Sequence, residues 1–152
     1  MATDNVITIT GNLADDPELR FTPNGVAVTS VRVAVNQRRF NRETSSWDER
    51  LDGFFTCNVW RDQAENVASS LTKGARVVVT GRLRSRSYED REGQTRWVTE
   101  IEADEICPSL RWATAKVERN PRGGGGGGGG SSETSWGAPA PASAPEPEDV
   151  PF

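Results

Sequence analysis

Arginine and aromatic side chains alternate along the stretch 82–88, with the spacing that places them on one face of a β-strand. Arg82, Arg84, Arg86 and Tyr88 follow one another at intervals of two residues. Successive side chains of a strand point to opposite faces, so these four would share a face. Aromatic rings stack on unpaired bases, and guanidinium groups neutralise phosphates. The stretch therefore predicts a surface for single-stranded nucleic acid.

Two further stretches put the same kinds of side chain in phase. In FFTCNVWR, alternation places Phe54 and Trp60 on one face with small polar residues, and gives the other face an apolar core stripe. Earlier in the chain, Arg32, Arg38 and Phe40 fall in phase if that strand is extended. One aromatic residue alone is more often a core or subunit contact, and an arginine run alone is as often a solvated face. The combined pattern on several strands favours nucleic-acid binding.

The order of elements predicts the fold class. Three strands, one helix and two more strands are the order of the OB-fold, a five-stranded antiparallel barrel with its helix between strands three and four. The helix prediction rests on apolar residues at helical spacing, with Asp62 as the cap and Gly74 as the stop. A further alternating stretch predicts an extra C-terminal strand. The expected strands are Asn5–Leu13, Val26–Asn36, Phe54–Arg61, Ala75–Glu89, Arg96–Ile106 and Leu110–Val117, and the expected helix is Asp62–Gly74.

Composition divides the chain into three parts. Eight consecutive glycines begin at Gly123, and a Pro-, Ser- and Ala-rich segment follows them. Such a sequence cannot bury enough apolar surface to offset its chain entropy. We therefore expect an all-β OB-fold domain at 1–118, a disordered Gly/Pro-rich linker at 119–145 and an acidic peptide at 146–152. The acidic residues of the tail account for the formal charge of −4, so the domain itself is neutral and compatible with a basic face.

Several classes of function are disfavoured by the residues present. The 152 residues include no histidine, which removes Ser-His, Cys-His and His-metal arrangements together. Cys57 and Cys107 do not form a CxxC pair and fit a reducing compartment. The glycine run lacks a following Lys-Ser/Thr, so it is not a phosphate loop. We expect no enzyme activity, no cofactor and no metal site.

The sequence also predicts where the protein works. No apolar run approaches 18 residues, and no basic-then-apolar signal opens the chain. We therefore expect no membrane or export segment, and a cytoplasmic, nucleoid-associated location.

The chain resembles bacterial single-stranded DNA-binding proteins of the replication type. The resemblance lies in VITITGNLADDPELRFTPNGVAV, in NVWRDQAENVASSLTKGARVVVTGRLRSRSYEDREGQTRWVTEIEADEI and in the final DVPF. It implies a homotetramer that coats single-stranded DNA without sequence preference. It also implies base stacking on Phe40, Phe54, Trp60 and Tyr88. Family members often have tryptophan where this chain has Phe54 and Tyr88, which keeps a π-face but reduces the stacking area.

The chain ends in a motif suited to capture by a partner. Phe152 carries both an apolar ring and the free carboxylate, which a pocket on a partner could bind together. Pro151 limits the conformational freedom that the peptide loses on docking. Glu148 and Asp149 would steer the peptide toward a pocket with a basic rim. The resemblance implies that this tip recruits replication, recombination and repair proteins. Because the tip has fewer acids than is usual, with Val150 before the proline, we expect weaker or more selective recruitment.

Other readings of the OB-fold stay open at this point. An RNA-binding module is one, because stacking does not read the 2′-hydroxyl. A protein adaptor is another, and an oligosaccharide site is a third, although sugars have less use for a row of arginines. The acidic tail and the resemblance favour DNA. The stretch Leu110–Val117 resembles an extension that reaches over a neighbouring subunit, and could instead be a sixth strand of its own barrel.

Overall fold

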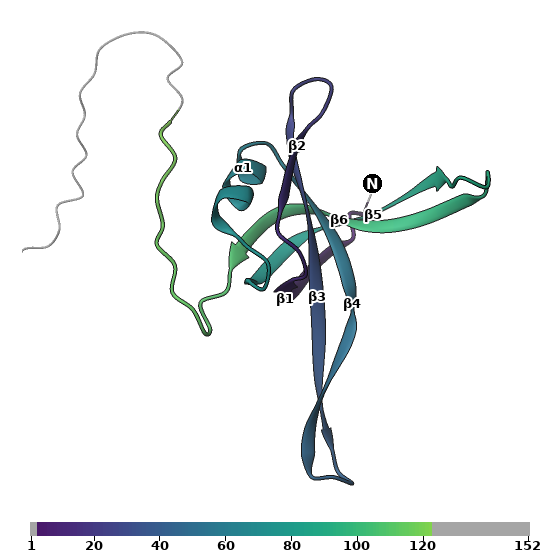
Figure 1. The fold of residues 1–152 in the computed structure, drawn as a ribbon, viewed down its shortest axis with the longest axis vertical. Coiled ribbons are helices and arrows are strands. Elements are labelled where there is room, and N and C mark those ends of the chain that lie inside the picture. The colour runs from purple at the N-terminus through teal and green to yellow at the C-terminus, as the bar shows by residue number, and fades with distance from the viewer. Residues whose placement is uncertain (1–2, 123–152) are drawn as a thin grey trace, which may run out of the picture. The chain divides into compact units, whose positions relative to one another are not determined.

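The computed structural model describes residues 3–122 and builds them mainly from β-strands. The chain divides into two units, Met1–Lys116 and Val117–Phe152, and every helix and strand of the described residues belongs to the first. The elements are β1 Val6–Leu13, β2 Glu18–Phe21, β3 Ala27–Asn41, β4 Ser46–Trp60, α1 Arg61–Ser70, β5 Arg76–Glu89 and β6 Thr95–Pro108 (Figure 1).

The strands close into a barrel. Neighbours follow the order β1-β5-β6-β4-β3-β2, and an additional pairing of β1 with β3 closes the ring. All pairings are antiparallel except the short parallel contact of β4 with β6, where Cys57 is opposite Ile101. Five strands in this order with one helix between β4 and β5 confirm the predicted OB-fold barrel.

Alternating apolar side chains fill the barrel. Val33, Cys57, Val59, Val77 and Val79 are fully buried, and each has exposed or half-buried neighbours along its strand. The helix α1 adds further buried residues to this core. The burial pattern therefore agrees with the period-two reading of the sequence.

The helix is fixed to the barrel by a buried hydrogen bond. The hydroxyl of Thr29, on β3, donates to the carbonyl of Ala64 at 2.9 Å. The helix begins at Arg61 rather than at Asp62, Trp60 is the residue at its N-cap, and no side chain makes a capping hydrogen bond. The prediction of Asp62 as the cap is therefore wrong. Among the described residues, no helix is long and apolar enough to span a membrane.

The strands extend beyond their predicted limits into two long ribbons. The strand β4 begins at Ser46, well before the predicted start at Phe54, and its first half pairs with β3. The turn between them is closed by the side chain of Asn41, which accepts the backbone N–H of Glu43 at 2.9 Å. Figure 1 shows the β3–β4 ribbon and the β5–β6 ribbon projecting from the barrel in different directions.

The predicted strand at Leu110–Val117 is not a strand in the structure. The sixth strand is instead β2, which pairs with β3 and which the sequence pattern did not predict. Pairing of β6 ends at Pro108, which has no N–H to continue a ladder. The backbone N–H of Ser109 still reaches the Arg76 carbonyl at 2.8 Å. Beyond it, the apolar side chains that suggested a strand are exposed: Leu110, Trp112 and Val117.

Candidate nucleic-acid interface

Register places the predicted binding residues on one outer face. On β3 and β4, Arg32 is opposite Thr56 and Ala34 is opposite Phe54. Residues that pair across strands share a face of the sheet. The parallel contact of β4 with β6 and the antiparallel pairing of β6 with β5 continue the same face, which we call the outer face. Its cross-strand pairs on these strands are Asn58 with Glu102, Arg82 with Glu102, Arg84 with Glu100, Arg86 with Val98 and Tyr88 with Arg96.

All four predicted stacking residues are exposed. Phe40, Phe54, Trp60 and Tyr88 keep 40–49% of their surface accessible to water, although the opposite face of the same strands in the barrel is buried. Phe54 lies in the middle of β4 and Trp60 is its last residue, both on the part of the strand that belongs to the barrel. Phe40 lies near the tip of the β3–β4 ribbon, and Tyr88 lies on the β5–β6 ribbon. The structure therefore places two of the rings over the barrel and one on each ribbon.

Two of these rings have neighbours that the sequence did not indicate. The ring of Trp47 packs edge-on to Phe40, with centroids 5.3 Å apart. Trp47 lies on β4 opposite Phe40, so it belongs to the same outer face. The guanidinium of Arg32 lies 4.2 Å from the centre of the Phe54 ring, a cation–π contact. A base that stacks on Phe54 would displace Arg32 or use the other side of the ring.

The predicted phosphate-binding arginines of β5 all contact carboxylates. Arg82 contacts Asp4 and Asp104 at 3.9 and 3.1 Å, and Arg84 contacts Asp4 at 3.3 Å. These pairs are at least 40% exposed. Exposed ion pairs contribute little to stability, so a phosphate could replace the carboxylate.

The two arginines of β3 have weaker acidic neighbours. Arg32 lies 4.0 Å from Asp15, at the limit of an ion pair. Arg38 is exposed and is opposite Glu49 in the register of the β3–β4 ribbon. All five predicted phosphate contacts therefore lie on accessible parts of the outer face, and each has an acidic residue close by or opposite it.

The outer face contains two glutamates of β6 that the sequence reading missed. Glu102 accepts the indole N–H of Trp60 at 2.6 Å. Glu100 accepts Arg86 through Nε and Nη2, both at 3.2 Å, and the Asn58 amide at 3.1 Å. The hydrogen bond from Arg86 keeps the pKa of Glu100 below its usual value, and the Asn58 amide acts in the same direction. The signal that could have found them is the alternation of Glu100 and Glu102 in TEIEADE.

Trp97 lies apart from this surface. It is opposite Ser87 in the register, one position away from Arg86 and Tyr88, and so on the other face of the β5–β6 ribbon. It is 73% exposed.

No catalytic group stands out among the described residues. In 3–122, no cluster of three or more His, Cys, Asp or Glu side chains could hold a metal ion. Burial raises the pKa of the Cys57 thiol to about 12, which keeps it protonated and unreactive at neutral pH. The predicted partner-binding residues Glu148, Asp149, Val150, Pro151 and Phe152 lie outside the described residues.

Comparisons with known proteins point to one family. The model of the single-strand binding protein family matches residues 4–108. A single-stranded DNA-binding protein of Corynebacterium glutamicum is 59% identical over 121 residues, which cover 80% of this chain and 54% of that protein. One from Mycolicibacterium smegmatis is 56% identical over 124 residues, covering 82% of this chain and 75% of that protein. The chain thus spans about half the length of the first relative and three quarters of the second.

A solved structure supports the same relationship. The small single-stranded DNA-binding protein from Streptomyces coelicolor superposes with a TM-score of 0.61 at 35% sequence identity. The match covers 72% of this chain and 97% of that one.

Proposed function

This chain belongs to the single-strand binding protein family, and from that membership we propose that it binds and coats single-stranded DNA without sequence preference. The outer face of β3, β4, β5 and β6 carries this activity. Bases stack on Phe40, Phe54, Trp60 and Tyr88, and phosphates contact Arg32, Arg38, Arg82, Arg84 and Arg86. The observation that supports the proposal is the shared outer face, which combines exposed rings and guanidinium groups on register-matched strands.

The chemistry of the outer face accounts for selectivity toward unpaired strands. Every base has a π-face, so stacking contributes about 1–3 kcal/mol per base with little sequence preference. A duplex hides these faces within its own stack. The role needs no catalytic group, and it fits a protein that works on DNA in the cytoplasm.

Replacing one stacking residue tests the placement of the site. The exchange Trp60→Ala removes an exposed ring from the outer face and should weaken oligo(dT) binding by about five- to 150-fold, the loss of one stacked base. The matched control is Trp136→Ala, which removes the same side chain from the tail and should leave affinity unchanged. Equal effects of the two exchanges, measured by fluorescence anisotropy of a labelled oligo(dT), would show that the face is assigned wrongly.

We propose a second role for the acidic end of the chain. Residues 146–152 recruit replication, recombination and repair proteins through the ring and carboxylate of Phe152 and the acids before them. The family membership and the composition of the tip support this. Removing the last four residues should abolish capture of partner proteins while oligo(dT) affinity stays the same or rises slightly. Loss of DNA binding in that variant would contradict this division of labour.

We also propose that the protein assembles as a homotetramer, so that four barrels bind one strand. The support is the family resemblance together with the exposed Leu110, Trp112 and Val117, apolar side chains that an adjoining subunit could cover. Native mass spectrometry with and without a long single strand should give four chains in both cases. A monomer at micromolar concentration would contradict this assembly.

A further inference from the structure

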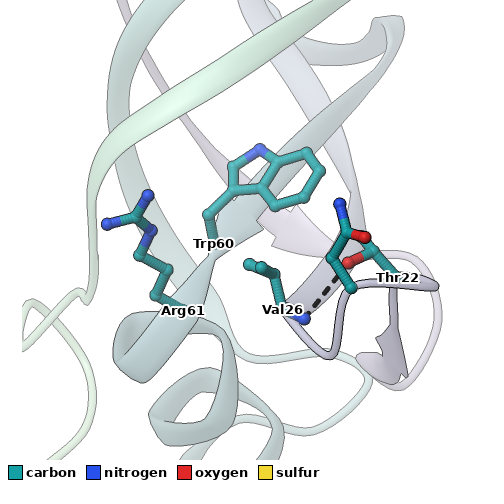
Figure 2. A pocket seen from close by; sticks show the side chains of 5 residues that line it. Thr22, Val26, Trp60 and Arg61 are labelled. Carbon is teal, nitrogen blue, oxygen red and sulfur yellow. Dashed lines mark hydrogen bonds between the residues drawn. The ribbon is translucent and has the colours of Figure 1, made fainter.

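A cavity lies at the end of the outer face, beside Trp60. It has a volume of about 560 Å³ and is lined by Thr22, Asn24, Val26, Trp60 and Arg61. In Figure 2, Val26 lies next to the Trp60 ring, Thr22 belongs to the same wall, and Arg61 rises on the other side of Trp60. Cavities of about 300–1,000 Å³ hold small ligands, so this space is large enough for one nucleotide.

The wall opposite Trp60 is a turn held by its own hydrogen bonds. The backbone N–H of Val26 donates to the Thr22 hydroxyl at 3.1 Å, and the Thr22 N–H donates to the Val26 carbonyl at 2.9 Å. Gly25 has a φ of 79°, a left-handed conformation that glycine adopts without steric cost. On the other side, Glu102 anchors the Trp60 indole. Both walls are therefore fixed before a ligand arrives.

Arg61 lines this cavity and differs from the arginines of β5, because no carboxylate among the described residues neutralises its charge. The arginines of β5 form ion pairs with Asp4, Asp104 and Glu100, whereas Arg61 forms none within residues 3–122. Its φ of 61° is left-handed, which is uncommon and strained for a long side chain. Such strain persists where surrounding structure holds it, often at a ligand site. Here it lies at the junction of β4 and α1, next to the exposed ring.

We propose that this cavity is a subsite for one nucleotide of the bound strand. The base packs between the Trp60 ring and the turn of Thr22–Val26, where Asn24 offers an amide donor and acceptor, and the guanidinium of Arg61 binds an adjoining phosphate. An aromatic wall beside an unpaired cation matches the two parts of a nucleotide, a flat base and an anionic phosphate. The subsite extends the path of the bound DNA beyond the end of β4. This inference rests on the proposed binding of single-stranded DNA.

Charge removal tests the subsite directly. The exchange Arg61→Gln should lower the affinity for oligo(dT) by about three- to tenfold. It should also reduce the slope of log K against log salt by about 0.7, the value for one phosphate of a single strand. The matched control is Arg50→Gln, an exposed arginine opposite Gln37 on the other face of the β3–β4 ribbon from Arg38. It removes the same charge and should change affinity less than twofold.

The outcomes separate the two proposals. If the wild-type chain binds oligo(dT) and Arg61→Gln behaves like Arg50→Gln, the subsite is wrong and the proposed function stands. If the wild-type chain does not bind oligo(dT), both proposals fail.

Photocross-linking gives a second measurement on the unaltered protein. An oligo(dT) carrying iododeoxyuridine should cross-link to Trp60 and also to the peptide that contains Thr22–Val26. Cross-links to Trp60 without any to that turn would show that the base lies on the outer face alone, and would overturn the subsite.

Discussion

Removing the negative charge of Glu100 should strengthen DNA binding. Its carboxylate lies on the outer face, is only 12% exposed, and accepts both hydrogen bonds from Arg86. A phosphate that binds Arg86 must therefore compete with Glu100 and then remain close to it. The exchange Glu100→Gln keeps the size of the side chain and one carbonyl acceptor but removes the charge, so the competition weakens.

The size of the gain follows from the distances involved. Two unit charges interact by about 1 kcal/mol at 4 Å in water and by about 0.5 kcal/mol at twice that distance. A phosphate that shares one guanidinium with Glu100 lies within this range. A repulsion of about 0.5–1 kcal/mol corresponds to a gain in affinity of about two- to fivefold.

Acidification should reproduce the effect in the wild-type protein. The hydrogen bond from Arg86 holds the pKa of Glu100 below its usual 4.5. The stabilising interaction between Arg86 and Glu100 is therefore fully present above pH 4.5, and it is lost as the pH falls through the lowered pKa of Glu100. The affinity difference between the wild-type protein and Glu100→Gln should narrow below pH 4.5, because protonation removes the same charge.

Anisotropy titrations of labelled oligo(dT) at low salt, from neutral pH downward, measure these effects. The matched control is Glu89→Gln, since Glu89 is an exposed acid opposite Thr95, on the other face of the same ribbon from Tyr88. It should change affinity by less than Glu100→Gln does. Weaker binding by Glu100→Gln would show that Glu100 positions Arg86 for the phosphate rather than competing with it, and would refute the reasoning.

Two further predictions concern the barrel. A thiol reagent should label the exposed Cys107 quickly in the native protein and Cys57 only after unfolding, because burial raises the Cys57 pKa to about 12; equal native rates would contradict the buried placement. The exchange Gly81→Ala should destabilise the fold by about 2–4 kcal/mol in urea denaturation, since its Cβ would collide with the β6 backbone. Gly53→Ala, whose Cβ has only an ordinary contact at 3.8 Å, is the control and should cost clearly less; a similar cost for both would refute the close approach at Gly81.

The sequence was enough to predict which side chains of one strand lie on the same face. Alternation follows from covalent geometry, which is why Phe54 and Trp60 were placed on a different face from Cys57. The order of strands and helix was enough to predict the barrel. The tips of the ribbons were predicted less well, because Trp47 and Leu51 are the only large apolar side chains in the segment 46–53 and do not give it an apolar period of two.

Contacts between side chains of different strands could not be predicted from the sequence pattern. Glu102 meets Trp60 across 42 positions of sequence, and this contact depends on the register of the parallel pairing of β4 with β6. A register shift between Thr80 and Gly81 further sets which residues of β6 face those of β5. The contacts of carboxylates with the predicted phosphate-binding arginines could therefore be identified only from the structure. Their presence changes the expected role of the arginines from free cations to cations that exchange partners.

Selectivity for unpaired bases is the central claim, and tryptophan fluorescence tests it most directly. The native protein should be titrated with oligo(dT) and, separately, with a duplex of the same length in the same salt. We predict strong quenching by oligo(dT), because a base on Trp60 replaces water at its exposed ring, and much weaker binding of the duplex. Equal affinity for both, or binding of oligo(dT) without quenching, would contradict the outer face as a stacking surface.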